Sequence, residues 1–467
     1  MITTSSLPRL FALQLALLLA AAPAALAQRP AGTDTVRISL DEALARAGAL
    51  GEEARIARAN VGIAATQVKS ARSAALPALD GSFTYVRTYA SPYQVKINPG
   101  AVDSSLASIA KLFSSLPFGR VNQYTANVTA TQAVFSPRLG SALRIATYFE
   151  SASKLGLREQ LAEMEYQVRT AYARAQLASE LEASAREAVA QAARFLDRER
   201  LRLAAGTSAD LDVLRADVSL ENLKPQLVDA QNAAALATLD LKRLVNVPLT
   251  APVVLTTHLE APKVLPLDGV DPATVVTDRA AVQAEQQQVR IAKEIVNQAI
   301  AAYIPSLDFR MSLGRILYPQ DVWGLNGRNW LTDWNASLTF KVPLFNGFKR
   351  GADLTQARLG LQQEEMRLAQ LREAVTLQYE QARGERSRAA ASVAARQRTV
   401  EQAQKVYDLT VLRYDQGLAT HLDVSDARLG LLMARANYAQ AVDQYYIADA
   451  GLQRALGMSS AVLSTVR

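Results

Sequence analysis

Four stretches of the chain alternate between apolar and polar residues with a period of two, the pattern of a β-strand with two different faces. "YTANVTATQAVF" (124–135) and "WNASLTFKVPLF" (334–345) are the clearest, and segments 81–89 and 307–315 alternate more loosely. Strands of this length with one apolar face are typical of a transmembrane barrel wall. An ordinary half-buried sheet on a helical core alternates in the same way, so alternation alone leaves both possibilities open. The strands are predicted over about 80–90, 122–135, 307–315 and 333–345.

The other long segments place apolar residues, mostly Ala and Leu, three and four positions apart, as in "LTQARLGLQQEEMRLAQLREAV" (354–375). A helix of about 65 residues is about 100 Å long, which no compact domain accommodates. The small apolar positions, flanked by polar residues on both sides, indicate a coiled-coil-like packing surface. We predict helices over about 40–75, 141–204, 210–245, 271–302, 349–415 and 421–457.

Four strands cannot close a barrel alone, and unpaired strand edges cannot face lipid because their backbone groups would lack partners. If the strands lie in a membrane, several chains must therefore build one barrel together. The expected fold is mainly α, with long antiparallel helical hairpins, and it includes a transmembrane β-barrel if the strands lie in lipid.

The chain contains an internal repeat. "RLAAGTSADLDVLRA" (202–216) matches "RYDQGLATHLDVSDA" (413–427), and "LDLKRLVN" (239–246) matches "AGLQRALG" (450–457) at the same spacing. A period this long signals duplication and not a short-repeat solenoid. We expect two structural repeats, 28–246 and 271–467, joined by a Pro-rich linker over 247–270.

Residues 1–27 have the features of a secretory signal peptide, with Arg9 before a short apolar core and a small-residue cleavage site ending at Ala27. The chain is therefore expected to be exported. The absence of cysteine excludes a disulfide framework and thiolate metal or nucleophile sites.

The sequence carries no HExxH, GxSxG or Gly-rich phosphate motif, so we expect no enzyme, no cofactor and no metal site. The formal net charge is +7, but the basic residues are dispersed among Glu and Asp at helical spacings. They are interpreted as solvated helix faces, and no nucleic-acid partner is expected.

The signal peptide, the duplicated halves, "LFNGFKRGADLTQA" after the last strand and "RYDQGLATHLDVSDA" at the last turn resemble the outer-membrane efflux protein family, the TolC-like channels. The resemblance implies a homotrimer in which four strands from each of three chains form a 12-stranded barrel in outer-membrane lipid. Below it, the helices would form a tunnel, or α-barrel, through the periplasm. The channel would serve as the passive exit duct of a tripartite efflux or type I secretion system. Its partners would be a periplasmic adaptor (membrane fusion) protein and an inner-membrane pump of the RND, ABC or MFS type.

The two glycine turns permit the chain to reverse at the tips of helical hairpins, and Thr420 with Asp423 has the form of a capping box. By resemblance, the tips would dock the adaptor; plain solvent-exposed turns are the alternative. These candidate docking residues are Gly206, Thr207, Gly417 and Leu418.

Asp423 and Asp426 are three positions apart and share a helix face. They could simply complement the dipole of the helix, but the resemblance implies carboxylate rings that gate the periplasmic entrance. It also implies that a hydrogen bond from the phenol of Tyr414 to the carboxylate of Asp212 ties neighbouring helices together and keeps the entrance shut. The chain carries Ala419 where some members of the family have an Arg that completes this lock.

Phe345, Asn346 and Gly347 end the last predicted strand in an Asn-Gly turn, and by resemblance they form the transition from barrel to tunnel. The phenylalanines there are suited to the membrane interface. An exported coiled-coil scaffold or adhesin without a pore is the alternative to a duct. It explains the helices and the signal peptide, but explains poorly the four strands and the matching halves.

Overall fold

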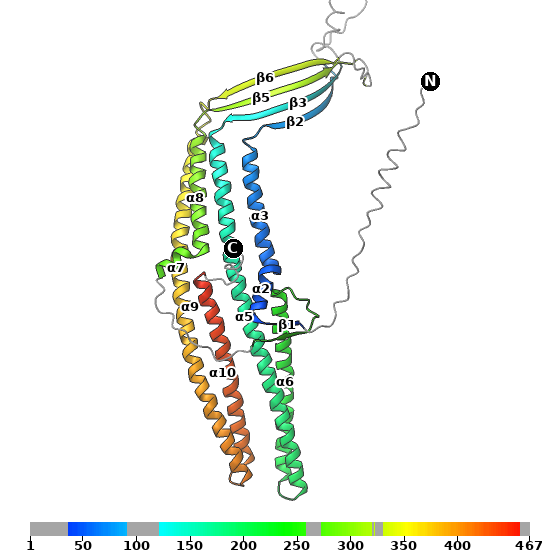
Figure 1. Ribbon diagram of the computed structural model, residues 1–467, viewed down its shortest axis with the longest axis vertical. Coiled ribbons are helices and arrows are strands. Elements are labelled where there is room, and N and C mark those ends of the chain that lie inside the picture. The colour runs from blue at the N-terminus through cyan, green and yellow to red at the C-terminus, as the bar shows by residue number, and fades with distance from the viewer. Residues whose placement is uncertain (1–35, 91–120, 258–271, 320–321, 323–329, 458–467) are drawn as a thin grey trace, which may run out of the picture.

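The computed structural model describes residues 36–90, 121–257, 272–319, 322 and 330–457. These residues form an elongated molecule with a four-stranded sheet at one end and two helical hairpin tips at the other (Figure 1). A small two-stranded sheet and the shortest helices lie near mid-height. The expected signal peptide (1–27) and residues 258–270 of the expected linker lie outside the described residues.

The elements of the chain follow a similar order in each half, in which helix, two strands and two long helices succeed one another. The first half contains β1 (Val36–Ile38), α2 (Leu40–Leu50), α3 (Glu52–Ser73), β2 (Ala78–Arg87), β3 (Asn122–Phe135), α5 (Pro137–Ala204) and α6 (Asp210–Leu244). The second half contains β4 (Val253–Leu255), α7 (Pro272–Asp278), α8 (Ala280–Ala301), β5 (Ser306–Leu317), β6 (Leu331–Lys341), α9 (Lys349–Asp415) and α10 (His421–Ala455).

The expectation of one helix over 40–75 is wrong, because the backbone breaks at Gly51 between α2 and α3. Gly51 has φ −57° and ψ 137°, an extended conformation. A Cβ at this position would lie 2.4 Å from the carbonyl oxygen of Ala47, so the break requires glycine. The periodicity of apolar residues continues across the break and therefore did not reveal it.

Two further boundaries differ from the sequence-based prediction. The helix expected over 271–302 is interrupted at Arg279, whose ψ of 124° separates α7 from α8. The strand expected over 333–345 ends at Lys341, two residues before Pro343, which lacks the N–H that a ladder needs. The short parallel pair β1–β4 was not expected, because three residues are too few to show a period.

The larger sheet has the order β2-β3-β5-β6, and every neighbouring pair is antiparallel. The two halves of the chain meet at its centre, where β3 pairs with β5. β2 and β6 are left as edges, and every residue in both strands is exposed. On β6 the exposed residues include Trp334, Leu338 and Phe340, which share one face.

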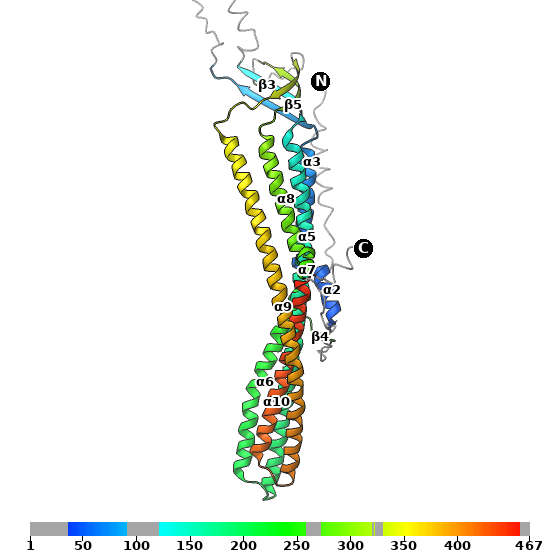
Figure 2. The same ribbon diagram turned by 90° about the vertical axis from the view of Figure 1, so that its left-hand side faces the viewer.

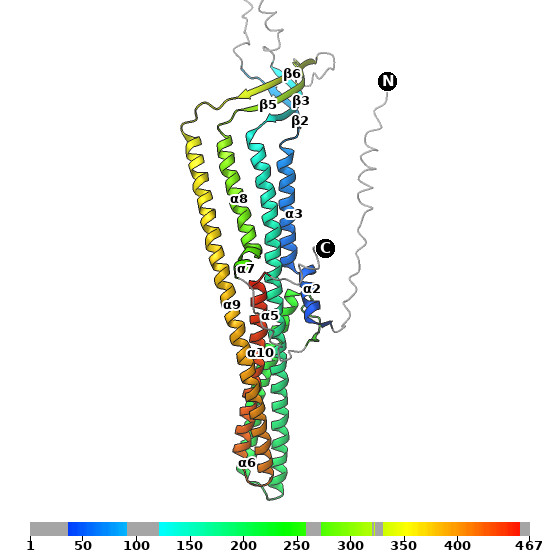
Figure 3. The same ribbon diagram turned by 60° about the vertical axis from the view of Figure 1, so that its left-hand side comes forward.

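Below the sheet, α3, α5, α8 and α9 lie in a row, each in contact with the next (Figure 3). Toward the other end, α5 with α6 and α9 with α10 form two antiparallel hairpins (Figure 2). α10 also packs against α5, which joins the two hairpins. Among the described helices, none combines the length and the apolar character needed to cross a membrane.

The largest buried apolar cluster lies at mid-height, where α2 and the small sheet pack against α5 and the end of α6. Ile38, Val168, Leu241 and Val245 are fully buried there. The hydroxyl of Tyr172 on α5 donates to the carbonyl of Ile38 and accepts from the N–H of Thr257, both at 3.1 Å. This phenol therefore fastens the small sheet to the longest helix of the first half.

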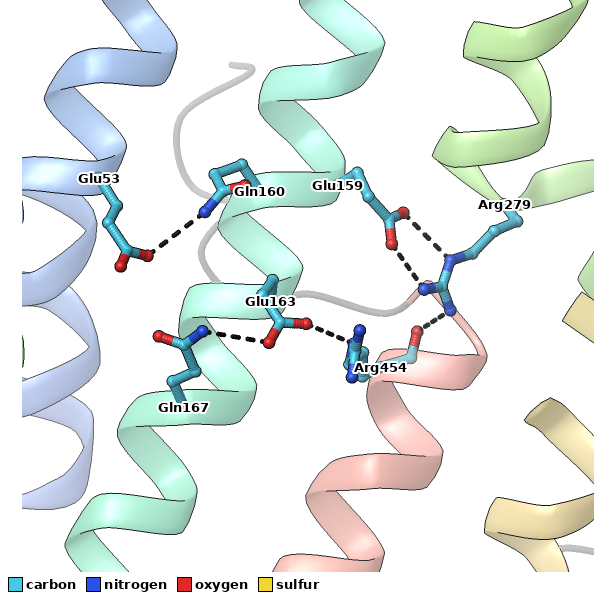
Figure 4. Close-up of polar contacts among 7 residues, drawn as sticks. All are labelled: Glu53, Glu159, Gln160, Glu163, Gln167, Arg279 and Arg454. Carbon is cyan, nitrogen blue, oxygen red and sulfur yellow. Dashed lines mark hydrogen bonds and ion pairs between the residues drawn. The ribbon is translucent and has the colours of Figure 1, made fainter.

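A charged cluster fixes the second half of the chain to the same level of α5 (Figure 4). Arg279 donates two hydrogen bonds to the carboxylate of Glu159, at 3.1 and 2.6 Å, and a third to the carbonyl oxygen of Arg454. The Arg454 guanidinium in turn forms an ion pair with Glu163 at 2.6 Å. The break that splits α7 from α8 thus places a guanidinium where it joins α5 and the end of α10.

We expect Glu159→Gln to lower the free energy of unfolding by about 2–3 kcal/mol, because it leaves a buried guanidinium without its counter-charge. The side chain of Arg279 is only 4% exposed. Glu380→Gln is the matched control, since it removes an exposed pair with Arg383 at 3.8 Å and should cost no more than about 0.5 kcal/mol. Thermal unfolding followed by circular dichroism measures both, and equal losses would contradict a structural role for the cluster.

Candidate functional site

The two hairpin tips have the same backbone geometry. Gly206 and Gly417 both adopt positive φ, 74° and 75°, which favours glycine. In each turn the glycine N–H donates to a carbonyl three residues back at 2.9 Å, and the N–H of the next residue donates to one five residues back. The second pair of bonds joins Thr207 to Arg202 and Leu418 to Arg413, at 2.9 and 2.8 Å. Leu418 is 65% exposed, so this tip presents an apolar side chain to solvent.

Just above the tips, the side chain of Tyr414 connects the second hairpin to the first. Its hydroxyl donates to Oε1 of Glu199 at 3.0 Å and accepts from Arg202 at 2.9 Å. The guanidinium of Arg202 also lies over the Tyr414 ring, 5.1 Å from its centroid. Burial and then the hydrogen bond to Glu199 raise the pKa of Tyr414, so the phenol stays protonated and remains a donor.

The acceptor expected for Tyr414 is therefore wrong. The single phenolic proton goes to Glu199, and Asp212 acts on Tyr414 only through its charge, which also raises the pKa of the phenol. The carboxylate of Asp212 instead forms an ion pair with Arg215 of its own helix at 3.7 Å. The predicted pair lies in one neighbourhood, but it is not joined by a hydrogen bond.

Glu199 is the residue of this site that the sequence did not reveal. Its side chain is 3% exposed, and it accepts from the Ser208 hydroxyl at 2.8 Å as well as from Tyr414 and Arg202. The repeat gave no signal, because the aligned position in the second half is Thr410. A carboxylate three positions before an arginine on a helix is normally a surface ion pair, and only the fold buries this one.

Asp423 and Asp426 lie on the first turns of α10 and are both exposed. The predicted capping box is present: the Asp423 carboxylate accepts from the N–H of Thr420 at 2.7 Å, and the Thr420 hydroxyl accepts from the N–H of Asp423 at 3.3 Å. Hydrogen bonds from Thr420 lower the pKa of Asp423. Asp423 thus caps the first turn of α10 at the tip.

Phe345, Asn346 and Gly347 lie at the opposite end of α9, where the chain leaves the sheet. Gly347 and Phe348 both have positive φ, 64° and 63°, so the turn is tight. The rings of Phe345 and Phe348 meet edge to face at 5.4 Å and are largely exposed. Arg350 donates to the carbonyls of Pro343 and Leu344 at 2.8 and 2.9 Å, which secures the connection between strand and helix.

In the part of the chain that the structure describes, no three His, Asp or Glu side chains gather in a way that could hold a metal ion. The site is thus a set of turns, a buried carboxylate–phenol contact and exposed acids. Its groups can hold helices together, release them and attract cations.

A sequence model of the family described as outer membrane efflux protein matches residues 39–247 and 274–458. The chain belongs to this family. It is 24% identical over 243 residues to the solvent efflux pump outer membrane protein SrpC of Pseudomonas putida, across 50% of this chain and 48% of that protein. The chain thus spans about half the length of the curated relatives it matches.

Two solved structures show the fold of this outer membrane efflux protein. The CmeC outer membrane channel of Campylobacter jejuni has a TM-score of 0.71 at 18% identity, over 90% of this chain and 85% of that one. The open state of the MtrE outer membrane channel of Neisseria gonorrhoeae has a TM-score of 0.72 at 19% identity, over 90% and 89%. The protein is located in the outer membrane, with its helical part in the periplasm.

We expect the first turn of α10 to fray in acid. The pKa of Asp423 is lowered in the folded protein, so the stability that its cap contributes is present above the ordinary pKa of an aspartate and is lost as the pH falls through the lowered value. Asp423→Ala should therefore speed amide hydrogen exchange in residues 421–425 at neutral pH. Asp426→Ala is the control, and equal acceleration by the two substitutions would show that the cap does not hold this turn.

Proposed function

We propose that three copies of this chain form a passive exit duct through the outer membrane. Each chain contributes four strands to a 12-stranded barrel and two helical hairpins to a periplasmic tunnel. The similar order of elements in the two halves, together with the matching hairpin turns, supports an origin by duplication. The energy for transport comes from partner proteins, and the duct itself opens and closes.

The open edges of the sheet carry this proposal. β2 and β6 each use one side of their backbone to pair within the chain, and the other side has no partner strand among the described residues. Because the sheet has an even number of antiparallel strands, β6 of one copy can pair antiparallel with β2 of the next and keep the alternation. In a bilayer such closure is required, since an unpaired edge has no water to bond.

The row of helices below the sheet is also open at both ends. α3 and α9 form its two edges, with α5 beside α3 and α8 beside α9. Copies arranged in a ring would place α9 of one copy beside α3 of the next, with the same symmetry that closes the sheet.

The tips are the proposed periplasmic entrance. In this proposal, Asp423 and Asp426 from each copy form carboxylate rings that favour cations, and the contact between Tyr414 and Glu199 holds the two hairpins together when the entrance is shut. The partners are a periplasmic adaptor, which docks on the turns at Gly206, Thr207, Gly417 and Leu418, and an inner-membrane pump of the RND, ABC or MFS type. Docking would open the entrance by favouring the state in which the hairpins separate.

An exported coiled-coil scaffold or adhesin is the competing function. It accounts for hairpins about 50 Å or more in length, but it gives no reason for a sheet whose edge strands are exposed along their whole length. Fractionation separates the two, because a duct is recovered from outer membranes as a heat-resistant trimer and a scaffold as a soluble periplasmic protein.

We expect Tyr414→Phe to raise the single-channel conductance or open probability of the purified trimer in planar bilayers. The ring is kept and only the donor to Glu199 is lost, and a hydrogen bond to a charged acceptor contributes about 1.5–3 kcal/mol. If the bond exists only in the closed state, opening becomes easier by about tenfold for each 1.4 kcal/mol lost. Glu199→Gln should have a larger effect, because it also weakens the contacts with Ser208 and Arg202.

The double variant decides whether these residues act on each other. Because they share one bond, adding Tyr414→Phe to Glu199→Gln should produce little further opening. Asp212→Asn is the matched control, since Asp212 makes no bond to Tyr414 and its substitution should change conductance much less. Additive effects of Tyr414→Phe and Glu199→Gln would show that their contact does not hold the entrance shut. The absence of channel activity in every variant would count against the duct.

A further inference from the structure

The contact between α5 and α10 is the seam at which the two hairpins meet, and four residue pairs define its register. Arg454 pairs with Glu163 and lies over the ring of Tyr166, 5.3 Å from its centroid. A Cβ on Gly451 would lie 3.7 Å from the Tyr166 ring. Further along, the charge of Arg174 acts on Asp443. From Arg454 to Gly451 to Asp443 on α10, the partners on α5 run from Glu163 to Tyr166 to Arg174, so the two helices are antiparallel along the seam.

Among the described residues, a carboxylate oxygen in this seam is buried without a hydrogen-bond partner: Oδ1 of Asp443. Oγ1 of Thr170 on α5 is likewise unbonded. Oε2 of Glu163 and Nε of Arg454, by contrast, pair with each other at 2.6 Å. Interiors normally satisfy buried polar atoms, so the unbonded carboxylate oxygen needs a reason.

Asp443 is the most unfavourable member of this group. The residue is 7% exposed, and one of its carboxylate oxygens has no donor. Burial raises its pKa to about 6, against the smaller opposing effect of Arg174. In this environment a charged carboxylate at neutral pH destabilises the packed contact between α5 and α10.

The arginines of α9 that contact this part of α10 are bonded to other residues. On α9, Arg386 donates to Asp449 at 2.6 Å and to Tyr445 at 3.2 Å. Also on α9, Arg396 donates to the carbonyl of Asn437 at 3.3 Å. On α5, the side chain of Arg174 is exposed, and its positive charge lowers the pKa of Asp443. By contrast, the contact between α9 and α10 contains well-bonded charges and the apolar cluster of Ala389, Val393, Ala441, Val442 and Tyr445.

We propose that the buried carboxyl of Asp443 makes the α5–α10 seam, along which the hairpins separate in the proposed duct, respond to protons. The α9–α10 hairpin moves as one body, because its internal contact combines a buried apolar cluster with paired charges. The inference rests on the proposed duct, in which separation of the hairpins opens the entrance. A drop in periplasmic pH would then favour the shut state.

The raised pKa of Asp443 sets the direction of the pH effect on the seam. The shut seam binds the Asp443 proton more tightly than the separated seam, where the carboxyl is solvated and has an ordinary pKa of about 3.9. The shut state is therefore favoured in acid and loses stability as the pH rises from about 4 to about 6. Above that window the carboxyl is charged in both states, and no further change is expected.

Thiol labelling measures this opening without any transport assay. The chain has no native cysteine, so a single Cys can be placed on the seam by Ala450→Cys, two turns from Asp443 on the same face and 3% exposed. Its rate of reaction with an uncharged maleimide, divided at each pH by that of the exposed variant Gln440→Cys, reports the fraction of time the seam is open. We expect this ratio to rise severalfold between pH 4.5 and pH 6.5, because the pKa of Asp443 differs between the shut and the open seam and solvent screens part of that difference.

Asp443→Asn should abolish the pH dependence and hold the ratio at its low-pH value. Asp449→Asn is the matched control, since its carboxylate is paired with Arg386 inside the hairpin, and it should leave the pH dependence intact. Ala441→Cys, buried between α9 and α10, should label slowly at every pH. A flat wild-type ratio, a pH dependence that survives Asp443→Asn, or equal opening at Ala441→Cys would each overturn the proposal. If Asp443→Asn does not assemble, the pH dependence of the labelling ratio in the protein that keeps Asp443 decides alone. Bilayer recordings test the proposed duct separately.

Discussion

The backbone of a strand carries hydrogen-bonding groups on two sides, and this constraint governs the architecture of the chain. β3 and β5 satisfy both sides within the molecule, whereas β2 and β6 satisfy only one. In water an exposed edge is a hazard for aggregation, and in lipid it is forbidden. The apolar face of β6 suits lipid, and in the proposed duct the missing partners of the two edges come from further copies.

The same requirement sets the arrangement of the helices. In the proposed ring of copies related by rotation, the helices beneath the sheet also form a ring, with α3 and α9 as the outermost members of each copy. At mid-height the buried cluster around Ile38 and the bonds from Arg279 to Glu159 fasten both halves of the chain to α5. Further toward the tips, the bond from Tyr414 to Glu199 joins the hairpins, and the buried carboxyl of Asp443 lies in the seam between α5 and α10. In the proposed duct, the contacts at mid-height hold the two halves together while the hairpins part at the tips.

Local patterns in the sequence predicted the elements but not the long-range contacts that give them their roles. The alternation around Trp334 and the repeated turns at Gly206 and Gly417 are local features, and the structure has strands and hairpin reversals at those positions. The break at Gly51 was missed because it depends on the carbonyl of Ala47 being too close for a Cβ, while the apolar period continues past it. Glu199 was missed because its partner is more than 200 residues away, and Arg279 because its partner lies 120 residues before it in the chain. The resemblance to relatives correctly brought Tyr414 and Asp212 into one neighbourhood, but the acceptor of the bond depends on which carboxylate the local packing buries.

Cross-linking between edge strands tests most directly whether the chain is one part of a closed ring. Since the chain has no cysteine, one Cys on β2 and one on β6, scanned along both strands, can form disulfides only where the two edges meet. A pair at Thr129 and Ser312, which face each other across β3 and β5, serves as the internal reference and should give a cross-linked monomer. If three chains close one barrel, some edge pairs should yield covalent trimers on oxidation, at alternate positions along the strands. Edge pairs that yield only monomers at every register, or ladders that extend beyond three chains, would contradict it.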